Sequence, residues 1–149
     1  MGPDFRLQER TVPPVTLLVD TSVWSLALRR DAPPALPEVG ALRTALESGE
    51  LVVTTGLILQ EILQGFAGPR ALDAILERFH ALPFLIPERR DHVEAAGLPN
   101  RCRRKGIQVG TIDALLAALC IRHGLSILTR DEDFIRIAEV APLSVWDGR

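Results

Sequence analysis

The sequence predicts an α/β fold in which helices cover both faces of a mainly parallel sheet of about four to five short strands. Two observations predict this class. Short apolar runs alternate along the chain with segments whose apolar residues recur at helical spacing. These runs also lack polar residues at every second position, which is typical of strands buried on both faces.

One domain is expected over residues 15–149, because 149 residues that are 47% hydrophobic and 24% charged can form one sizeable core. Residues 1–14 would form an N-terminal arm, whether a flexible native segment, a vector remnant or the product of an upstream start codon. This arm has no apolar signal-peptide core, and no later run approaches the about 20 apolar residues of a membrane span. We therefore expect a cytoplasmic protein. Cys102 and Cys120 are too few for a disulfide framework, so ordinary thiols are expected.

The first half of the chain is expected to hold two strands and four helices. Val15–Val19 is an apolar strand that ends at Asp20, and Thr21 or Ser22 can cap the helix that follows over residues 21–30. Prolines and glycines then mark the ends of the elements. These elements are a helix over Glu38–Ser48, a strand over Leu51–Val53, and helices over Thr55–Gln64 and Arg70–His80.

The second half is expected to hold three strands and further helices. Helical material over Glu88–Arg104 should be interrupted near Gly97 and Pro99, because proline disrupts a helix interior. The next helix begins at Thr111 and ends before Gly124, a residue type that often follows a helix end. The remaining elements are strands over Phe84–Ile86, Ser126–Thr129 and Leu143–Val145, with a helix over Glu132–Glu139.

Two aspartates stand at the ends of predicted strands. Asp20 ends the first strand, and Asp131 follows the strand over Ser126–Thr129. Ligands of open α/β sheets bind beyond the carboxyl ends of the strands, so both aspartates would lie at the functional edge. Each also has a plain structural interpretation, because aspartate is a preferred helix N-cap.

Glu61 lies on the apolar stripe of its helix. It follows Ile58 by three residues and stands next to Ile62, so its carboxylate points along the buried side. Removing an unpaired carboxylate from water costs several kcal/mol, so Glu61 must be paired, protonated or bound to a cation. A buried arginine partner remains an alternative.

Asp113 repeats this pattern, because it shares a helix face with Leu116 and Ala117. Its place in the first helical turn could simply complement the helix dipole, although that does not explain its apolar neighbours. Carboxylates brought together raise one another's pKa, and a bound divalent cation removes the conflict. Because the four acids offer only oxygen ligands, the expected ion is Mg²⁺, with Mn²⁺ as a substitute.

The ordered set of acidic motifs resembles the PIN-domain ribonucleases, and most closely the VapC-like toxins of type II toxin–antitoxin pairs. The matching stretches are VDTSVW at 19–24, QEIL at 60–63, TIDALLAALC at 111–120 and LTRDEDF at 128–134. Each motif is short, but their order and spacing cover the chain from Val15 to Val145. The resemblance implies a PIN-like fold and a single PIN domain over residues 15–149.

The resemblance also implies roles for individual residues. The catalytic acids would be Asp20, Glu61, Asp113 and Asp131. Asp20, Asp113 and Asp131 would bind the metal, with Glu61 bound directly or through water. Asp133 stands where some relatives carry an additional acid, and Glu132 is expected to face solvent. Thr21, Ser22 and Thr111 resemble hydroxyl positions that help to orient the acids.

The implied activity is Mg²⁺-dependent hydrolysis of phosphodiester bonds in structured RNA such as tRNA or rRNA. The resemblance further implies a cognate VapB-like antitoxin that inhibits the protein, and a homodimer. The net charge is only −2, but a basic run offers candidate contacts to the RNA backbone. This run consists of Arg101, Arg103, Arg104 and Lys105, and a solvated helix face is its alternative interpretation.

Two other classes of function compete with a nuclease. A phosphoacceptor signalling domain also gathers acids at a sheet edge, but it needs an acid pair at the first strand and a lysine after a late strand. Here Thr21 follows Asp20, and Lys105 is the only lysine. A catalytically silent PIN-like interaction module would have lost one of the acids, whereas all four are present. A nucleotide-binding oxidoreductase is disfavoured, because no G-x-G-x-x-G follows the first strand.

Overall fold

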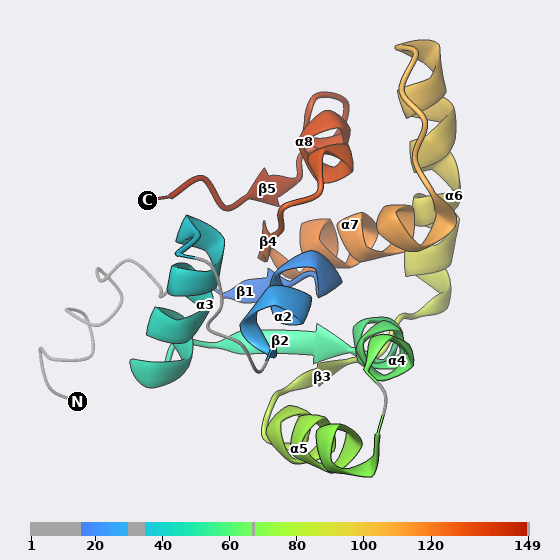
Figure 1. Ribbon diagram of the computed structural model, residues 1–149. Coiled ribbons are helices and arrows are strands. Elements are labelled where there is room, and N and C mark those ends of the chain that lie inside the picture. Colours follow the sequence, from blue (N-terminus) through green and yellow to red (C-terminus); the bar gives the residue numbers. More distant parts are fainter. Residues whose placement is uncertain (1–15, 30–34, 67, 149) are drawn as a thin grey trace, which may run out of the picture.

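Five parallel strands form one sheet, in the order β3-β2-β1-β4-β5 (Figure 1). The computed structural model describes residues 16–29, 35–66 and 68–148, so the expected N-terminal arm lies outside the described residues. The strands are β1 (Leu17–Val19), β2 (Val52–Thr55), β3 (Phe84–Leu85), β4 (Ser126–Leu128) and β5 (Ser144–Val145). Every pairing is parallel, which confirms the predicted class of sheet.

Seven helices flank the sheet within the described residues. They are α2 (Thr21–Ala27), α3 (Pro37–Glu47), α4 (Gly56–Gly65), α5 (Pro69–His80), α6 (Arg89–Arg104), α7 (Thr111–His123) and α8 (Glu132–Ala138). Helix α2 packs against α3 and α4, whereas α7 packs against α6, α8 and β4. No helix in the described part of the chain is long and apolar enough to cross a membrane.

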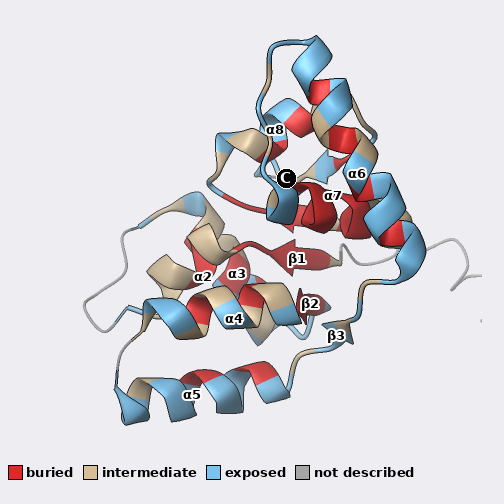
Figure 2. Ribbon diagram, turned by 90° about the vertical axis from the view of Figure 1, so that its right-hand side faces the viewer, coloured by how far each residue is buried: buried red, intermediate tan, exposed pale blue. Residues whose placement is uncertain are grey.

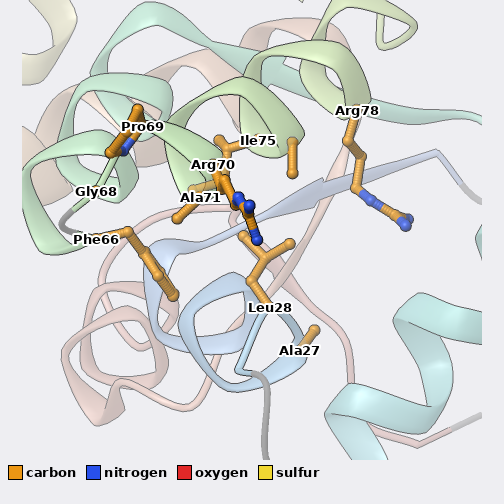
Figure 3. Close-up of a pocket in the computed structure, with 10 residues that line it drawn as sticks. Ala27, Leu28, Phe66, Gly68, Pro69, Arg70, Ala71, Ile75 and Arg78 are labelled. Carbon is orange, nitrogen blue, oxygen red and sulfur yellow. The ribbon is translucent and has the colours of Figure 1, made fainter.

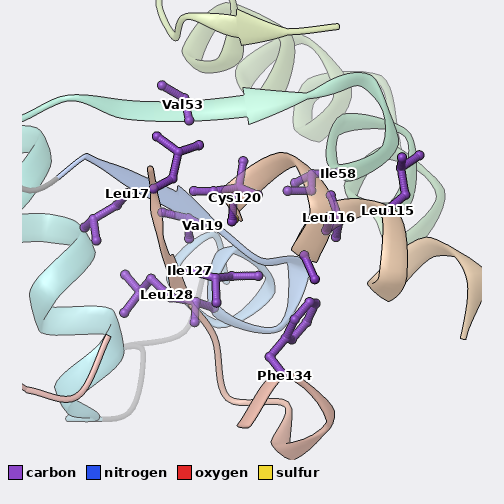
Figure 4. Packing of buried hydrophobic residues seen from close by; sticks show 14 of the residues in the cluster. Leu17, Val19, Val53, Ile58, Leu115, Leu116, Cys120, Ile127, Leu128 and Phe134 are labelled. Carbon is purple, nitrogen blue, oxygen red and sulfur yellow. The ribbon is translucent and has the colours of Figure 1, made fainter. Parts of the chain in front are cut away.

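Helix α7 is buried over most of its length (Figure 2). All seven residues from Ala114 to Cys120 are buried, because the strands cover one side of the helix and its helical neighbours cover the others. Figure 4 shows Leu116 and Cys120 packed among side chains of the strands, together with Phe134 of α8. The apolar character of this helix on all its faces therefore reflects a position inside the core.

Helix α6 is continuous from Arg89 to Arg104, so the predicted interruption near Gly97 and Pro99 is wrong. Proline inside a helix removes one hydrogen bond and crowds the preceding turn, at a cost of about 3 kcal/mol. Packing against α7 outweighs this cost, because Leu98 and Cys102 are buried on either side of Pro99. Both cysteines are free and buried, in line with ordinary thiols.

An ion pair also joins α6 to α7. Asp91 in the first turn of α6 is 1% exposed, and its carboxylate accepts a bond from Arg122 Nη2 at 2.8 Å. The Arg122 guanidinium lowers the pKa of Asp91 below its ordinary value, mainly through this hydrogen bonding. Because Arg122 stands at the C-terminal end of α7, the pair holds that end of the helix against α6.

The remaining differences from prediction are at element boundaries. Asp20 itself caps α2, where Thr21 or Ser22 was expected. Strand β2 continues to Thr55, so α4 begins one residue later than predicted, at Gly56. Gly124 follows α7 with a φ of 66°, the left-handed conformation expected of a glycine at this position.

Candidate active site

Asp20 and Asp131 lie at one edge of the sheet because their strands are neighbours. Strand β1 pairs with β4 through Val19 and Leu128, and the Asp20 backbone N–H donates to the Leu128 carbonyl at 2.9 Å. Each aspartate then caps the helix that follows it, α2 or α8. The capping role and the place at the functional edge are therefore compatible.

Asp20 is held by hydrogen bonds to a single carboxylate oxygen. Asp20 is buried, with 7% of the residue's surface exposed. The Oδ2 atom accepts a bond from Ser22 Oγ at 2.8 Å and another from Thr129 Oγ1 at 2.9 Å. The Ser22 backbone N–H is a more distant donor, at 3.4 Å. None of these bonds goes to Oδ1, so this oxygen is the one left to bind a ligand.

Two further carboxylates, those of Asp113 and Asp133, lie close to Asp131. One ligand oxygen each from Asp113, Asp131 and Asp133 lies within 4.8 Å of the others, a group that could hold a metal ion. The Asp131 Oδ1 atom accepts the Asp133 backbone N–H at 3.0 Å. Phe134, the residue after Asp133, is fully buried. Burying this side chain stabilises the fold by about 1.5–3 kcal/mol and holds the first turn of α8 against the core.

Asp133, whose role the sequence left open, therefore belongs to the group of carboxylates that could hold a metal ion. Its carboxylate also pairs with Arg136 Nη1 at 3.1 Å, one turn along α8. Glu132 points elsewhere, with a side chain that is 78% exposed and a 3.4 Å contact to Arg136. Of the three acids in this stretch, Asp131 and Asp133 belong to the group that could hold a metal ion, and Glu132 does not.

Asp113 lies among all the other acids of the site. Its pKa is raised to about 6, first by burial and then by the negative charges of four carboxylates. In decreasing order of effect, these belong to Asp131, Asp20, Asp133 and Glu61. Ionising this group is costly because the neighbouring charges are all of the same sign. The five acids thus form one electrostatic unit.

Glu61 approaches the unit from α4, between the buried residues Ile58 and Ile62. Burial raises the pKa of Glu61, and the charge of Asp20 raises it further. The nearby Thr21 hydroxyl, which is buried and has no hydrogen-bond partner among the described residues, lowers this pKa and is the smallest of the three effects. Among the described residues, no arginine or lysine forms an ion pair with Glu61, unlike Asp91.

The expected hydroxyl residues differ in their contacts. Ser22 donates a hydrogen bond to Asp20, and the Thr21 hydroxyl lowers the pKa of Glu61, whereas Thr111 is exposed and its side chain bonds to none of the acids in the described part of the chain. The sequence did not single out Thr129, whose hydroxyl contacts both Asp20 and the Asp131 backbone. Its only signal was its position at a strand end, two residues before an acid of the site.

The basic run divides between two sides of α6. Arg101 lines a hollow of about 280 Å³ between α6 and α7, together with Arg122. Arg103 lines a different hollow of about 380 Å³ beside Gly110, the N-cap of α7. Because Asp113 stands in the first turn of α7, Arg103 belongs to the end of the molecule that carries the acids.

These carboxylates fit a hard divalent cation. The donors are oxygens only, and repulsion among them raises the pKa of Asp113, a cost that a bound cation would remove. Mg²⁺ and Mn²⁺ prefer carboxylate and water ligands, so the donor set suits either ion.

Comparisons with known proteins agree with this geometry. The family model of the PIN domain matches residues 17–140. Ribonuclease VapC11 of Mycobacterium tuberculosis is 35% identical over 135 residues, which cover 89% of this chain and 99% of that protein.

Solved structures share the fold at lower identity. VapBC2 from Rickettsia felis, bound to a DNA fragment from its promoter, has a TM-score of 0.69 at 16% identity, covering 89% of this chain and 100% of that one. VapC20 of Mycobacterium tuberculosis, described as a sarcin-ricin loop cleaving toxin, has a TM-score of 0.62 at 18% identity, with coverage of 86% and 98%. The family match and the 35% identity together place this chain in the PIN-domain family, among the VapC ribonucleases.

Proposed function

We propose that the chain is a Mg²⁺-dependent endoribonuclease toxin that hydrolyses phosphodiester bonds in structured RNA, such as tRNA or rRNA, in the cytoplasm. The observation that carries the proposal is the convergence of five carboxylates at the carboxyl ends of β1 and β4. They are Asp20, Glu61, Asp113, Asp131 and Asp133. The 35% identity to a ribonuclease over nearly the whole chain supports the same activity.

The catalytic roles divide among these acids. Asp20, Asp113 and Asp131 would hold the cation, with Glu61 bound directly or through water. A divalent cation, when bound, supplies charge neutralisation at the scissile phosphate and a lower pKa for the attacking water. Asp113 and Asp131 are the two candidates for accepting the proton of that water, because both lie in the group of ligand oxygens. Asp133 adds a further carboxylate to this group.

RNA would reach the acids along the end of the molecule that carries Arg103. Phosphate contacts from arginine and lysine set affinity and position without reading sequence. The exposed residues Arg103, Arg104 and Lys105 follow one another at the end of α6, close in sequence to the loop that leads to α7. Arg101 lines the other side of α6, so its replacement should matter less for RNA binding.

Cleavage of purified host tRNA and rRNA tests the activity. The wild type should cut RNA with Mg²⁺ or Mn²⁺, and a chelator should abolish cleavage. Asp113→Asn should be inactive, whereas Glu139→Gln, an exposed acid at the far end of α8, should retain wild-type activity. A folded wild type that cuts no host RNA with either ion would contradict the proposal.

An antitoxin is the proposed protein partner. A hollow of about 860 Å³ lies between the end of α2 and α5, lined largely by apolar side chains (Figure 3). Leu28, Phe66 and Ile75 are among the residues that line it, and Arg70 and Arg78 add positive charge. Such a surface suits a protein segment that carries apolar side chains together with acids. The relative from Rickettsia felis was solved as a VapBC complex, which supports this kind of partner.

Co-expression with the protein encoded by a neighbouring short reading frame tests this partner. The complex should copurify and should lack RNase activity. Leu28→Asp should weaken the complex without loss of activity in the free protein, because Leu28 lies in the hollow and outside the acidic cluster. Full inhibition of Leu28→Asp at wild-type antitoxin concentrations would place the partner elsewhere.

A homodimer is also proposed, on the strength of the family resemblance. Light scattering on the purified protein should give twice the 16.4 kDa mass of one chain. A mass of one chain at micromolar concentration would contradict this proposal but not the nuclease activity.

A further inference from the structure

Two hydroxyl groups bridge the ends of β1 and β4. Thr129 Oγ1 donates to Asp20 Oδ2 at 2.9 Å and accepts the Asp131 backbone N–H, also at 2.9 Å. Ser22 Oγ donates to the same Asp20 oxygen at 2.8 Å and accepts the Arg130 backbone N–H at 3.0 Å. Each hydroxyl therefore links the Asp20 carboxylate to the backbone of the loop that carries Asp131.

The direction of these bonds is fixed by the groups at their ends. A backbone N–H can only donate, so each hydroxyl must accept on that side. A hydroxyl has one proton, and it is then free to point toward the carboxylate, which only accepts. The two hydroxyl oxygens are 3.4 Å apart, but both protons are already directed to Asp20. Both hydroxyls therefore donate to Asp20 and accept from the backbone of the loop.

The bridges also select one oxygen of Asp20. Oδ2 receives both hydroxyl protons, whereas Oδ1 receives neither. Thr129 is 9% exposed, and its hydrogen bond to Asp20 joins two residues that are 109 positions apart in the sequence. Its hydroxyl touches the side chain of one acid and the backbone of another, a connection that neither Ser22 nor Thr21 makes.

We infer that Thr129 is a positioning residue, which fixes Asp131 relative to Asp20 and leaves Asp20 Oδ1 as the oxygen that meets the cation. The inference rests on the metal-dependent part of the proposed function. Thr129 does not itself touch the cation or the RNA. It acts by setting the spacing between two ligand groups, and partners that orient metal ligands typically change metal affinity or activity by about 10–100-fold.

Thr129→Val tests this role, because valine keeps the size of the side chain and removes the hydroxyl. We expect Mn²⁺ affinity, measured by titration calorimetry on the purified protein without RNA, to fall by about tenfold or more. The kcat for RNA cleavage should fall by a similar factor, whereas KM should stay within about twofold, because RNA contacts lie elsewhere. Thr129→Ser, which restores the hydroxyl, should return Mn²⁺ affinity to within about threefold of the wild type.

A matched control lies on β4, the strand that Thr129 directly follows. Ser126 at the start of β4 shares a hydrogen bond with Ser144 of β5, with their Oγ atoms 2.8 Å apart. Ser126→Ala removes a hydroxyl from β4 at the end away from the acids, so Mn²⁺ affinity and kcat should not change. Thermal unfolding of every variant shows whether the fold is kept, and Thr129→Ala takes the place of Thr129→Val if the latter does not fold.

The outcomes separate this inference from the proposed function. Wild-type Mn²⁺ affinity in Thr129→Val would overturn the positioning role, as would a loss in Thr129→Ser equal to that in Thr129→Val. If the wild type binds Mn²⁺ in a Thr129-dependent way but cuts no RNA, the nuclease proposal fails and the positioning role stands. A wild type that neither binds Mn²⁺ nor cuts RNA overturns both.

Discussion

The junction between β1 and α2 and the junction between β4 and α8 are built alike, yet they do different things. Each begins with an aspartate that caps its helix through one carboxylate oxygen. Two residues later, the first junction has Ser22, whose hydroxyl bonds to Asp20, and the second has Asp133, whose carboxylate joins Asp131. At the first junction two hydroxyls hold the Asp20 carboxylate through Oδ2, whereas the second junction accumulates negative charge. The comparison shows how one local motif can anchor a site at one strand and leave it open for a cation at the next.

The largest expected difference between the junctions is in stability. In the metal-free protein, Asp20→Ala should lower the free energy of unfolding by about 2–4 kcal/mol, because it removes a cap and leaves the buried Thr129 hydroxyl and the half-buried Ser22 hydroxyl without this acceptor. Asp131→Ala should cost only about 0.5–2 kcal/mol, the usual range for a lost cap. Urea denaturation measures both values. An equal or larger loss for Asp131→Ala would mean that Asp20 is not the anchor.

Asp113 lies among the acids of both junctions, and its charge can be tested through pH. Its pKa is 3.8 in the unfolded chain and about 6 in the fold, so the folded state binds the proton more tightly. This group therefore makes the metal-free protein less stable as pH rises from about 4 to about 6. At pH 7 without a cation, Asp113→Asn should melt at a higher temperature than the wild type.

Adding Mg²⁺ should reverse that order, because a ligand that binds only the folded state stabilises it. The wild type should gain melting temperature with rising Mg²⁺, and Asp113→Asn should gain much less. Differential scanning calorimetry at matched ionic strength checks both statements. A metal-free wild type more stable at pH 7 than Asp113→Asn would show that repulsion within the cluster is small.

A smaller effect is expected for Asp133, which already has an arginine partner. Asp133→Asn should weaken Mn²⁺ binding by less than about tenfold, compared with tenfold or more for Asp131→Asn. Glu132→Gln is the matched control, because Glu132 contacts the same Arg136 but is largely exposed. Calorimetric titration with Mn²⁺ compares the three variants. Equal losses in Asp131→Asn and Asp133→Asn would make Asp133 a full ligand.

The smallest effect is expected for the ion pair between Arg130 and Glu38, with its closest atoms 2.6 Å apart. Arg130→Ala removes this pair but keeps the backbone N–H that Ser22 accepts. Its cost should be no more than about 1 kcal/mol, because exposed ion pairs contribute little. A cost above that of Asp131→Ala in urea denaturation would mean that the ion pair, and not the hydroxyl bridge, holds the loop.

The parallel sheet and the gathering of Asp20, Glu61, Asp113 and Asp131 could be predicted because both depend on local patterns. A strand that ends in an aspartate is visible in one stretch of chain, and parallel pairing then brings such ends to one edge. The anomaly of Glu61 was also visible, since an acid on an apolar stripe needs no distant information to be noticed. Asp91 was overlooked for the opposite reason: its arginine partner, Arg122, comes from another helix.

What could not be predicted depends on contacts between distant segments. Thr129 resembles any strand-end threonine until β4 is known to pair with β1, which places its hydroxyl on Asp20. The continuity of α6 through Pro99 likewise follows from burial against α7, which local propensity does not contain. The place of Asp133 beside Asp131 also depends on Asp131 being the N-cap of α8, a boundary that sequence patterns fix only to within a few residues.

The burial of α7 has a consequence for how this protein can be controlled. Asp113 sits on a helix whose next seven residues are all inside the core, and whose far end is tied to α6 by Arg122. Moving Asp113 away from the other acids would require unpacking the core, so its position relative to them is fixed by the fold itself. Within the described residues, helix α7 therefore holds Asp113 in place, and a partner that covers the site would control the proposed activity more readily than a movement of this helix.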